Sequence, residues 1–518
     1  EGDPLCIKEY PKKDLYGGDY GKDTYQFKFL KMYFNEMKKD GYQAKVYEKY
    51  IESLNYGSNI PITETTRGIQ ISNIVFPSID IFSDEDEITE DNFSKNYGGS
   101  ALFKLVQNKK NVHTYHKKFR TSKGFVPIFD LKHIGSISSK IHNLLHGFKK
   151  EKPKGIIFIY SEFLPSGIIP LALALETMGF EKYSGNLWHD ERDDPIDFEW
   201  NPMKKGSKNA RYIILSGNKN LSPNNDEEIK ELISDKNIQG ERIKIVIGSV
   251  VAAEGLDLRN IREIHLLDPW FHLSRVEQII GRGIRYCSHT QLKKEERNVT
   301  VYQHVAGLEK DVESIDTYTY RKAEEKAVVI GQVENILKEN AVDCYLNQQI
   351  NQINKKKLLP VNLVTSRNHP IPDYEVHDKM FSKVCSYAEC GYKCNCNEIT
   401  EKDINYDTFT MENSKYLFTN IQKIIIELYE LRNYYTLDEL QDRIMETTDT
   451  NTTIIYYTLY HMIDQEIPIW NKEEKVSGYL INKNEYYLFQ PDSNGDRSAP
   501  LYYLSDTGSI DTQKYLPL

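Results

Sequence analysis

The chain has 518 residues, of which 39% are hydrophobic and 27% charged, and its net charge is -10. A single core rarely grows beyond about 250–300 residues, so this length predicts about two to four domains. No stretch approaches the roughly 20 apolar residues of a membrane span, and the first residues do not resemble a secretory signal. We therefore expect a soluble intracellular protein without membrane contact, and the acidic balance argues against indiscriminate nucleic-acid binding.

Basic residues are concentrated between positions 103 and 154, where thirteen lysines and arginines outnumber two acidic residues. Such a local excess can follow a phosphate backbone, although an exposed basic helix and loop would give the same count. The sequence begins Glu1-Gly2-Asp3-Pro4 rather than with methionine, and for this reason we expect a piece of a longer chain.

The first 100 residues or so are polar, and we expect irregular backbone there apart from one helix over residues 27–54. The acidic run SDEDEITED at residues 83–91 predicts an exposed loop. From residue 136 the pattern changes, because SISSKIHNLLHGFKK at residues 136–150 spaces its apolar residues as a helix does.

Short apolar runs then alternate with amphipathic segments up to residue 306. We expect strands over residues 156–160, 211–216, 244–249, 262–268 and 299–306, and helices over residues 168–180, 225–235 and 273–281. Apolar strands separated by helices predict an α/β fold with a doubly wound parallel sheet. In such sheets ligands bind at the loops that follow the carboxyl ends of the strands.

A long helical region is expected over residues 311–351. Further on, three helices at residues 415–433, 436–445 and 452–464 precede two strands at residues 478–482 and 486–491. Three helices and a hairpin in this order predict a winged-helix-like module. Its third helix carries no lysine or arginine, so we expect it to dock a protein or to pack on the α/β part of the chain rather than to read a DNA groove.

The seven cysteines are an odd number and poorly spread for a disulfide framework, which favours a reducing compartment. Four of them fall within twelve residues: Cys385, Cys390, Cys394 and Cys396. Four thiolates could close a tetrahedral Zn²⁺ site, and reduced cysteines with a packing role are the alternative. We assign no metal site on this spacing.

Residues 277–289 read EQIIGRGIRYCSH and lie on and after the helix that follows a core strand. Positions three apart share a face of a helix, so Arg282 and Arg285 could direct two guanidinium groups at one anion. Arginines in this role stabilise the charge that develops on a phosphoryl group as it is transferred. Surface or interdomain ion pairs would explain the same two arginines, and the motif alone does not separate these alternatives.

A second motif lies upstream. SVVAAEGLDL at residues 249–258 places Ser249 at the end of a strand, followed by Gly255 and Asp257. This spacing lets the backbone approach a phosphate chain and fixes a turn. In tandem with the arginine run, the segment resembles motifs V and VI of the superfamily 2 helicases, which lie on the second RecA-like domain of those enzymes.

The resemblance implies roles for individual residues. The run from Gln278 to Arg285 matches the pattern Gln-x-x-Gly-Arg-x-x-Arg, which implies that Arg282 and Arg285 are catalytic and approach the γ-phosphate of ATP. The residues implied to bind the nucleotide are Gln278, Gly281, Gly255 and Asp257. The residues implied to contact nucleic acid are Ser249, Ser161 in the motif IV-like run GIIFIYSEF, and Ser216 in ILSG.

Further segments narrow the resemblance. FIYSEFLPSGIIPLALALETMGF, SNIVFPS, AVDCYLN and GYLINKNEYYLFQP are similar to the helicases of large nucleocytoplasmic DNA viruses, whose relatives include the poxvirus early transcription factor small subunit and nucleoside triphosphatase I. The resemblance implies a helicase or translocase that uses ATP and Mg²⁺ and acts on DNA or RNA in viral transcription or genome handling. It implies viral RNA polymerase or transcription factors as partners, and a location in the viral factory, the host cytoplasm or the virion.

The chain departs from that family in what it lacks. YGKDT at residues 20–24 has no hydroxyl residue directly after its lysine and so is no P-loop. The acidic run at residues 79–87 follows SNIVFPS, which lies beyond the first domain in the relatives, so we assign it to a loop rather than to a Walker B box. We therefore expect a carboxyl-terminal helicase portion without the first RecA-like domain. Binding of ATP and Mg²⁺ would need that domain, so we expect this portion to be inactive by itself. The alternative is a non-catalytic nucleic-acid-binding or scaffolding subunit of a viral transcription complex.

We expect four parts along the chain: a linker or insert over residues 1–135, the second RecA-like domain over residues 136–310, a helical extension with the cysteine cluster over residues 311–413, and a winged-helix-like accessory domain over residues 414–518. The RecA-like part would hold every residue named above for nucleotide and nucleic acid.

Overall fold

The computed structural model describes residues 6–7, 10–54, 59–77, 88–89, 92–109, 112–115, 127–188, 195–202, 204, 207–249, 258–348, 358–395, 411–472, 475–483 and 485–492. The chain divides into two compact units, Glu1–Cys396 and Asn397–Leu518, with separate hydrophobic cores. None of the helices described has the length and apolar composition needed to cross a membrane.

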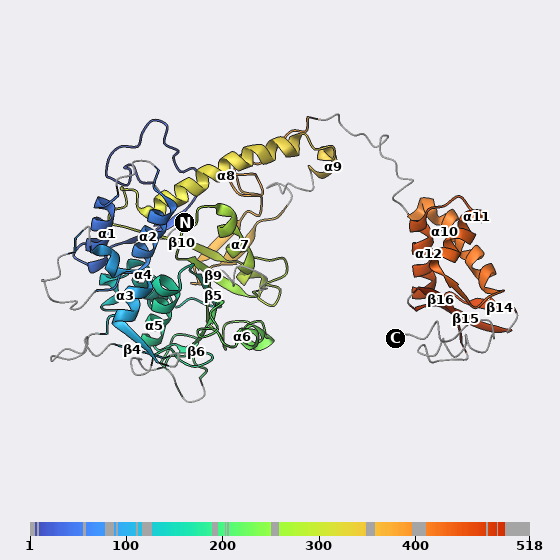
Figure 1. Ribbon diagram of the computed structural model, residues 1–518, viewed down its shortest axis with the longest axis horizontal. Coiled ribbons are helices and arrows are strands. Elements are labelled where there is room, and N and C mark those ends of the chain that lie inside the picture. The colour runs from blue at the N-terminus through green and yellow to red at the C-terminus, as the bar shows by residue number, and fades with distance from the viewer. Residues whose placement is uncertain are drawn as a thin grey trace. The chain divides into compact units, whose positions relative to one another are not determined.

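An eight-stranded sheet is the centre of the first unit (Figure 1). Seven of the strands described run parallel, and β1 at one edge is antiparallel to its neighbour. In order of pairing the strands are β1 (Cys6–Ile7), β2 (Met32–Glu36), β10 (Thr300–Gly307), β9 (Ile261–Leu266), β5 (Ile156–Tyr160), β8 (Ile245–Gly248), β7 (Arg211–Leu215) and β6 (Glu181–Lys182).

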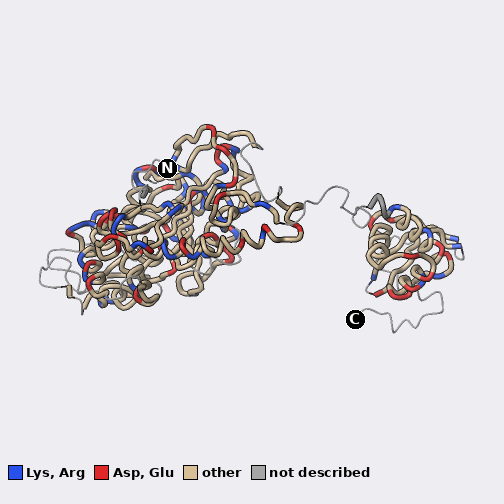
Figure 2. The backbone as a smooth tube through the Cα atoms, turned by 90° about the horizontal axis from the view of Figure 1, so that it is seen from above, with Lys and Arg blue, Asp and Glu red and all other residues tan. Residues whose placement is uncertain are grey.

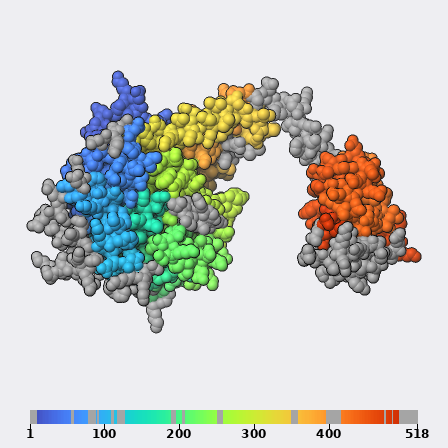
Figure 3. Space-filling model, in the orientation of Figure 1, coloured from blue at the N-terminus to red at the C-terminus, as the bar shows by residue number. Residues whose placement is uncertain are grey.

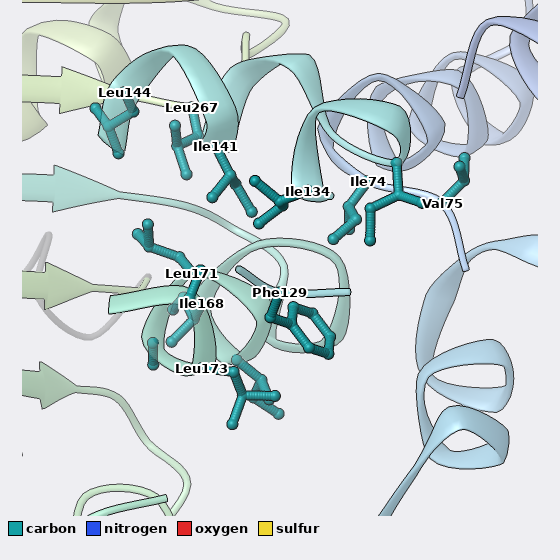
Figure 4. Packing of buried hydrophobic residues seen from close by; sticks show 14 of the residues in the cluster. Ile74, Val75, Phe129, Ile134, Ile141, Leu144, Ile168, Leu171, Leu173 and Leu267 are labelled. Carbon is teal, nitrogen blue, oxygen red and sulfur yellow. The ribbon is translucent and has the colours of Figure 1, made fainter. Parts of the chain in front are cut away.

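Helices cover both faces of this sheet, because the central strands are apolar on both sides. On β5, Ile157 and Ile159 enter one core, whereas Ile156 and Phe158 enter the other. The first core is closed by α1 (Tyr42–Glu52), α2 (Ile62–Asn73), α3 (Gly98–Leu105), α4 (Ser139–Glu151) and α5 (Ile169–Thr177), and part of it is drawn in Figure 4. The second is closed by α6 (Asn225–Leu232), α7 (Leu273–Gly283) and α8 (Ile315–Glu339).

The expected α/β fold with a doubly wound parallel sheet is confirmed. The strands expected between residues 156 and 306 coincide with β5, β7, β8, β9 and β10 to within two residues at each end. The helix expected over residues 27–54 is wrong in its first half, where the chain forms β2 and only then α1. The pairing partner of β2 is β10, more than 260 residues away, so local periodicity could not reveal this strand.

Smaller elements complete the first unit. Two hairpins pair β3 (Val106–Lys109) with β4 (Val112–Tyr115), and β11 (Val361–Val364) with β12 (Pro370–Tyr374). Short helical turns are η1 (Phe93–Asn96), η3 (Ile134–Ser136), η4 (Leu164–Ile168), η5 (Asp235–Asn237), η7 (Lys294–Glu296) and α9 (Cys344–Asn347). The helix α8 lies on the surface of the unit, where it is yellow in Figure 3.

The second unit has a winged-helix-like order of elements. Its helices are α10 (Met411–Tyr429), α11 (Leu437–Thr447) and α12 (Thr452–Asp464), and its strands are β13 (Tyr434–Thr436), β14 (Ile469–Asn471), β15 (Val476–Lys483) and β16 (Tyr486–Pro491). The strands pair in the order β13-β16-β15-β14. The expected three helices and hairpin are therefore confirmed, and β13 and β14 are additions that the sequence pattern did not predict.

Three cysteines of the expected cluster form disulfides in the structure. Cys385 pairs with Cys390 and Cys394 pairs with Cys344, with Cα–Cα distances of 4.8 and 5.8 Å. The expectation of reduced cysteines is wrong here, because α8 and α9 bring the distant Cys344 to the cluster. Cys396 lies outside the described residues, among which no group of three or more His, Cys, Asp or Glu side chains is suited to a metal ion.

Gly155 lies where β5 begins, at a positive φ of 76°, and packs against Arg262 at the start of β9. A Cβ at Gly155 would approach the Cγ of Arg262 to 2.3 Å. The Arg262 side chain cannot move away cheaply, since it is buried and donates to the carbonyls of Asn298 and Val364 at 3.2 and 2.8 Å. The glycine thus allows β5 and β9 to pair at their first residues.

We predict that Gly155→Ala lowers the free energy of unfolding of the first unit by more than about 2 kcal/mol, because it combines backbone strain with an overpacked contact. Gly185→Ala is the matched control: Gly185 has a φ of 102°, and a Cβ added there would meet no atom within 4 Å, so only about 1 kcal/mol of strain is expected. Urea unfolding followed by tryptophan fluorescence measures both, since three of the four tryptophans belong to this unit. Equal losses in the two variants would contradict the contact with Arg262.

A buried carboxylate on β9 joins the hairpin β11–β12 to the sheet. Burial raises the pKa of Glu263, but a hydrogen bond with His265 and the charge of Arg367 outweigh burial and lower that pKa to about 2. Arg367 lies 3.0 Å from the Glu263 carboxylate and 3.1 Å from that of Glu151 on α4. The ionised form of Glu263 is therefore favoured by the fold.

A carboxylate whose pKa is lowered by folding stabilises the protein above its ordinary pKa and loses that contribution as the pH falls. We therefore predict that part of the stability of the first unit is lost between about pH 4.5 and pH 2 through Glu263. Glu263→Gln should flatten the dependence of the unfolding free energy on pH between about pH 4.5 and pH 2, as measured by urea unfolding at each pH. Glu48→Gln, at an exposed position of α1, should leave the slope unchanged.

Candidate nucleotide and nucleic-acid site

Three of the expected site residues follow neighbouring strands of the sheet. Ser161, Ser249 and Ser216 come directly after β5, β8 and β7, which pair in that order. The backbone N–H of Ser161 donates to Gly248 at 3.1 Å, and that of Ser249 donates to Leu215 at 3.0 Å. The structure therefore brings these three positions together at the carboxyl edge of the sheet, where ligands meet α/β folds.

The hydroxyl groups of these serines are used within the protein. Ser161 is fully buried and donates to Asp268 at 2.8 Å. Ser216 is 2% exposed and shares a hydrogen bond with Ser222 at 2.9 Å, and Ser249 is 6% exposed. Burial at this level means that a ligand at this edge would meet the neighbouring backbone and side chains before it met the hydroxyls.

Asp268, two residues after β9, organises the same edge. Its carboxylate accepts hydrogen bonds from the backbone N–H of Glu162 at 2.5 Å, from Ser161 and from Asn73. Burial raises the pKa of Asp268, and the charge of Lys140 opposes this shift. The edge is therefore tied to α2, which carries Asn73, and to α4, which carries Lys140.

Lys140 is buried and has a partner on three other segments. Its ammonium group donates to Asn73 at 2.8 Å and to the carbonyl of Leu267 at 2.6 Å, and it pairs with Asp316 on α8 at 2.7 Å. Burial raises the pKa of Asp316 to about 6, again opposed by Lys140. Among the lysines and arginines of residues 103–154 whose burial the structure describes, only Lys140 is buried.

The helix α7 presents the nucleotide-binding candidates. Gln278 is exposed and Arg282 is half-exposed, four residues later on the same face. Gly281 faces open space, whereas a Cβ at Gly283 would lie 2.9 Å from the Cδ1 of Ile264 on β9. The glycine that lets the end of α7 approach the sheet is therefore Gly283, which the motif comparison did not single out.

Arg285 does not lie on the helix, contrary to the expectation that it shares a helical face with Arg282. The helix ends at Gly283, and Ile284 leaves the helical region with φ -121° and ψ 81°. In the turn that follows, the backbone N–H of Ser288 donates to the carbonyl of Arg285 at 3.1 Å, and the backbone N–H of Arg285 donates to the hydroxyl of Ser288 at 3.2 Å. Arg285 is therefore exposed on a loop just beyond the helix.

Gly255 and Asp257 lie outside the described residues, so their expected roles at the nucleotide stay predictions. The residues described at this place are exposed or half-exposed amide and guanidinium donors: Gln278, Arg282 and Arg285. Donors of this kind fit the oxygens of a phosphate chain, because a guanidinium can hold two of them at once. The expected role of these three residues at the nucleotide stays a prediction.

Sequence reasoning missed a cluster at the start of α7. The Arg275 guanidinium donates to the carboxylate of Glu162 at 2.5 Å and to the hydroxyl of Tyr160 at 3.1 Å. It also lies over the ring of Trp270, 3.9 Å from the ring centroid. The spacing of Arg275 and Arg282, seven positions apart on one helix, was the signal that could have indicated a shared face.

Comparison with known families identifies the class of domain. Residues 199–287 match the family described as "Helicase conserved C-terminal domain", a range that includes β7, β8, β9 and α7. The chain therefore carries a helicase carboxyl-terminal domain on a RecA-like sheet, as the two motifs predicted.

Among curated proteins the chain is similar to helicases of large DNA viruses. It is 28% identical over 436 residues to "Putative ATP-dependent RNA helicase L377" of Acanthamoeba polyphaga mimivirus, covering 73% of this chain and 36% of that protein. It is 32% identical over 280 residues to "Putative helicase 087L" of Invertebrate iridescent virus 3, covering 52% and 24%. With "Termination factor NPH-I homolog" of African swine fever virus (isolate Pig/Kenya/KEN-50/1950) it shares 29% identity over 237 residues, covering 40% and 33%. The chain thus spans about a third or less of the length of these relatives.

Among solved structures, the crystal structure of the C-terminal part of the Fun30 ATPase domain aligns with 61% of this chain and 90% of its own, at 13% identity and a TM-score of 0.31. A TM-score this low does not bear on the fold, which rests on the strand order.

We predict that Ser161→Ala lowers the stability of the first unit by about 1–3 kcal/mol, because the substitution removes a buried donor from Asp268. Ser274→Ala, at an exposed position of α7, is the matched control and should change stability by less than about 0.5 kcal/mol. Urea unfolding gives both values. If Ser161→Ala weakened nucleic-acid binding while stability stayed unchanged, the hydroxyl would contact nucleic acid directly and its bond to Asp268 would contribute nothing to stability.

Proposed function

We propose that this chain is the second motor domain, with its accessory unit, of an ATP-dependent nucleic-acid helicase or translocase of viral type. The observation that carries this proposal is the placement of exposed Gln278 and Arg285 and half-exposed Arg282 along and just beyond α7, beside a RecA-like sheet. In the proposed reaction Arg282 and Arg285 meet the γ-phosphate of ATP and stabilise the charge that develops on it.

The other side of the phosphate site would come from a first RecA-like domain. That domain would supply the P-loop lysine and the carboxylates that hold Mg²⁺, neither of which the sequence motifs of this chain provide. The chain by itself should then be inactive. Closure of the two domains on ATP brings the arginines to the phosphates, and opening after hydrolysis withdraws them, which gives directional movement.

Nucleic acid, DNA or RNA, would cross the carboxyl edge of the sheet near Ser161, Ser216 and Ser249. Lys104 is exposed on α3, which packs against η4 directly after β5, and it supports this path by charge. Lys149 and Lys150 are exposed at the end of α4 that leads into the start of β5, so they lie at the opposite edge of the sheet. Figure 2 shows basic and acidic positions interspersed along the rest of the first unit. A local excess of positive charge, rather than the net charge of the whole unit, would thus attract the phosphates of the nucleic-acid strand. Viral RNA polymerase or transcription factors are the protein partners we infer, in the infected cell or the virion.

A non-catalytic scaffolding role is the second candidate, and the second unit favours it. The helix α12 exposes Tyr456, Tyr457 and Tyr460, at 46%, 43% and 65%, and carries no lysine or arginine. Exposed tyrosines without basic neighbours suit protein docking better than groove reading. The coding region upstream of Glu1 distinguishes the candidates, since a motor requires a P-loop and an Asp-Glu box there.

We predict that Arg282→Ala and Arg285→Ala each reduce ATP turnover of the complete protein about 10³-fold or more, because the arginines act mainly on the transition state. Affinity for ATP should change far less. Steady-state ATPase kinetics and fluorescent-nucleotide titration give the two quantities.

Arg67→Ala is the matched control for the loss of an arginine, since Arg67 forms a surface pair with Glu64 at 2.8 Å within α2. Turnover of this variant should stay within about twofold of the unchanged protein, because a surface ion pair contributes about 1 kcal/mol or less to stability. Unchanged turnover in Arg282→Ala and Arg285→Ala would remove both residues from the active site and leave the scaffolding role.

A further inference from the structure

The first turn of α7 is not held by a helix cap. His272 occupies the N-cap position, and its side chain accepts no hydrogen bond from the first turn. Side chains that do so satisfy an otherwise unpaired backbone N–H of the first turn. The first turn of α7 is therefore held by other contacts: Leu273 and Val276 pack in the core, and one polar interaction joins the turn to β5.

Arg275 makes that interaction. Its guanidinium group contacts Glu162 and Tyr160, both at the carboxyl end of β5, and stacks on Trp270 in the loop before α7. Glu162 also accepts from the Tyr160 hydroxyl at 3.0 Å, so the three polar groups bond one another. The side chains of Arg275 and Glu162 are 20% and 21% exposed, so water screens their charges only in part. The first turn of α7 is thus fastened to β5.

Arg275 and Arg282 lie on the same face of α7. Seven residues correspond to about 700°, close to two full turns, and to about 10 Å along the axis. Gln278 lies between them at three residues from the first. Because a short helix moves as one body, a tilt of α7 at Arg275 also displaces the guanidinium group of Arg282.

The opposite side of α7 has its own attachment. Glu277 accepts a hydrogen bond from the Tyr387 hydroxyl and pairs with Lys383 at 3.1 Å. Phe29 stacks on Tyr387 with ring centroids 5.6 Å apart. The helix is therefore held from two sides, by β5 through Arg275 and by residues 383–387 through Glu277.

We propose that Arg275 is a positioning residue that couples the carboxyl end of β5 to the arginine that meets the γ-phosphate. This inference rests on the proposed function. Through Arg275, the edge where nucleic acid would cross and the helix that carries Arg282 move together. Arg275 touches neither ATP nor nucleic acid in this proposal, and it acts only through the placement of Arg282.

The test uses the complete protein and four variants: Arg275→Ala, Arg275→Lys, Arg282→Ala and the double variant Arg275→Ala with Arg282→Ala. A misplacement of about 1 Å can cost on the order of a hundredfold in rate, so we expect kcat of Arg275→Ala to fall at least about tenfold. The KM for ATP should change less than about twofold, because the nucleotide is bound chiefly by the first domain. Arg275→Lys should restore only part of the rate, since lysine keeps the charge but not the fork that bonds Glu162 and Tyr160.

The double variant separates positioning from general stability. If Arg275 acts through Arg282, removing it from a protein that already lacks Arg282 lowers kcat little further. Independent effects that multiply in the double variant would overturn the proposal. The same holds if Arg275→Ala lost activity only in proportion to the unfolded fraction measured by circular dichroism.

The failure of this inference differs from the failure of the proposed function. If Arg282→Ala abolishes turnover while Arg275→Ala leaves kcat unchanged, the motor function stands and the positioning role of Arg275 falls. If the complete protein does not hydrolyse ATP, or if Arg282→Ala leaves turnover unchanged, the motor function falls and the positioning role falls with it.

Discussion

A buried ammonium group imposes the arrangement of the first unit. Lys140 is fully buried, and a charge of this kind is tolerated in a protein interior only when charged and polar groups surround it. Those groups come from α2, from the carbonyl at the end of β9 and from α8, whose Asp316 provides the compensating charge. Segments nearly 250 residues apart must therefore be in place together. The carboxyl edge of the sheet, with Asp268 at its centre, is fixed by the same requirement.

The sheet and its order of elements were predictable from the sequence because they depend on local patterns. Runs such as IIFIY are apolar on both faces and short, and amphipathic segments of helical length separate them. The strand β2 could not be predicted in the same way, because its five residues become a strand only beside β10. The disulfide between Cys344 and Cys394 could not be predicted for a similar reason, since the two cysteines are 50 residues apart in sequence.

The candidate site was predictable in its residue types but not in its geometry. The spacing of Gln278, Arg282 and Arg285 indicated a phosphate-binding segment, yet the helix ends between the two arginines, at Gly283, which the spacing did not predict. The serine positions were placed correctly at the edge, but their hydroxyl groups proved to be buried because Asp268 and Ser222 use two of them. Burial is decided by neighbours from other elements, which no single motif contains.

The two units have no core residue in common. Among the described residues, each unit completes a hydrophobic interior of its own. In evolutionary terms, a boundary between two such interiors is a place where recombination can exchange one accessory unit for another. The first unit could in this way acquire new binding partners while its sheet, its buried lysine and its arginine-bearing helix stay unaltered.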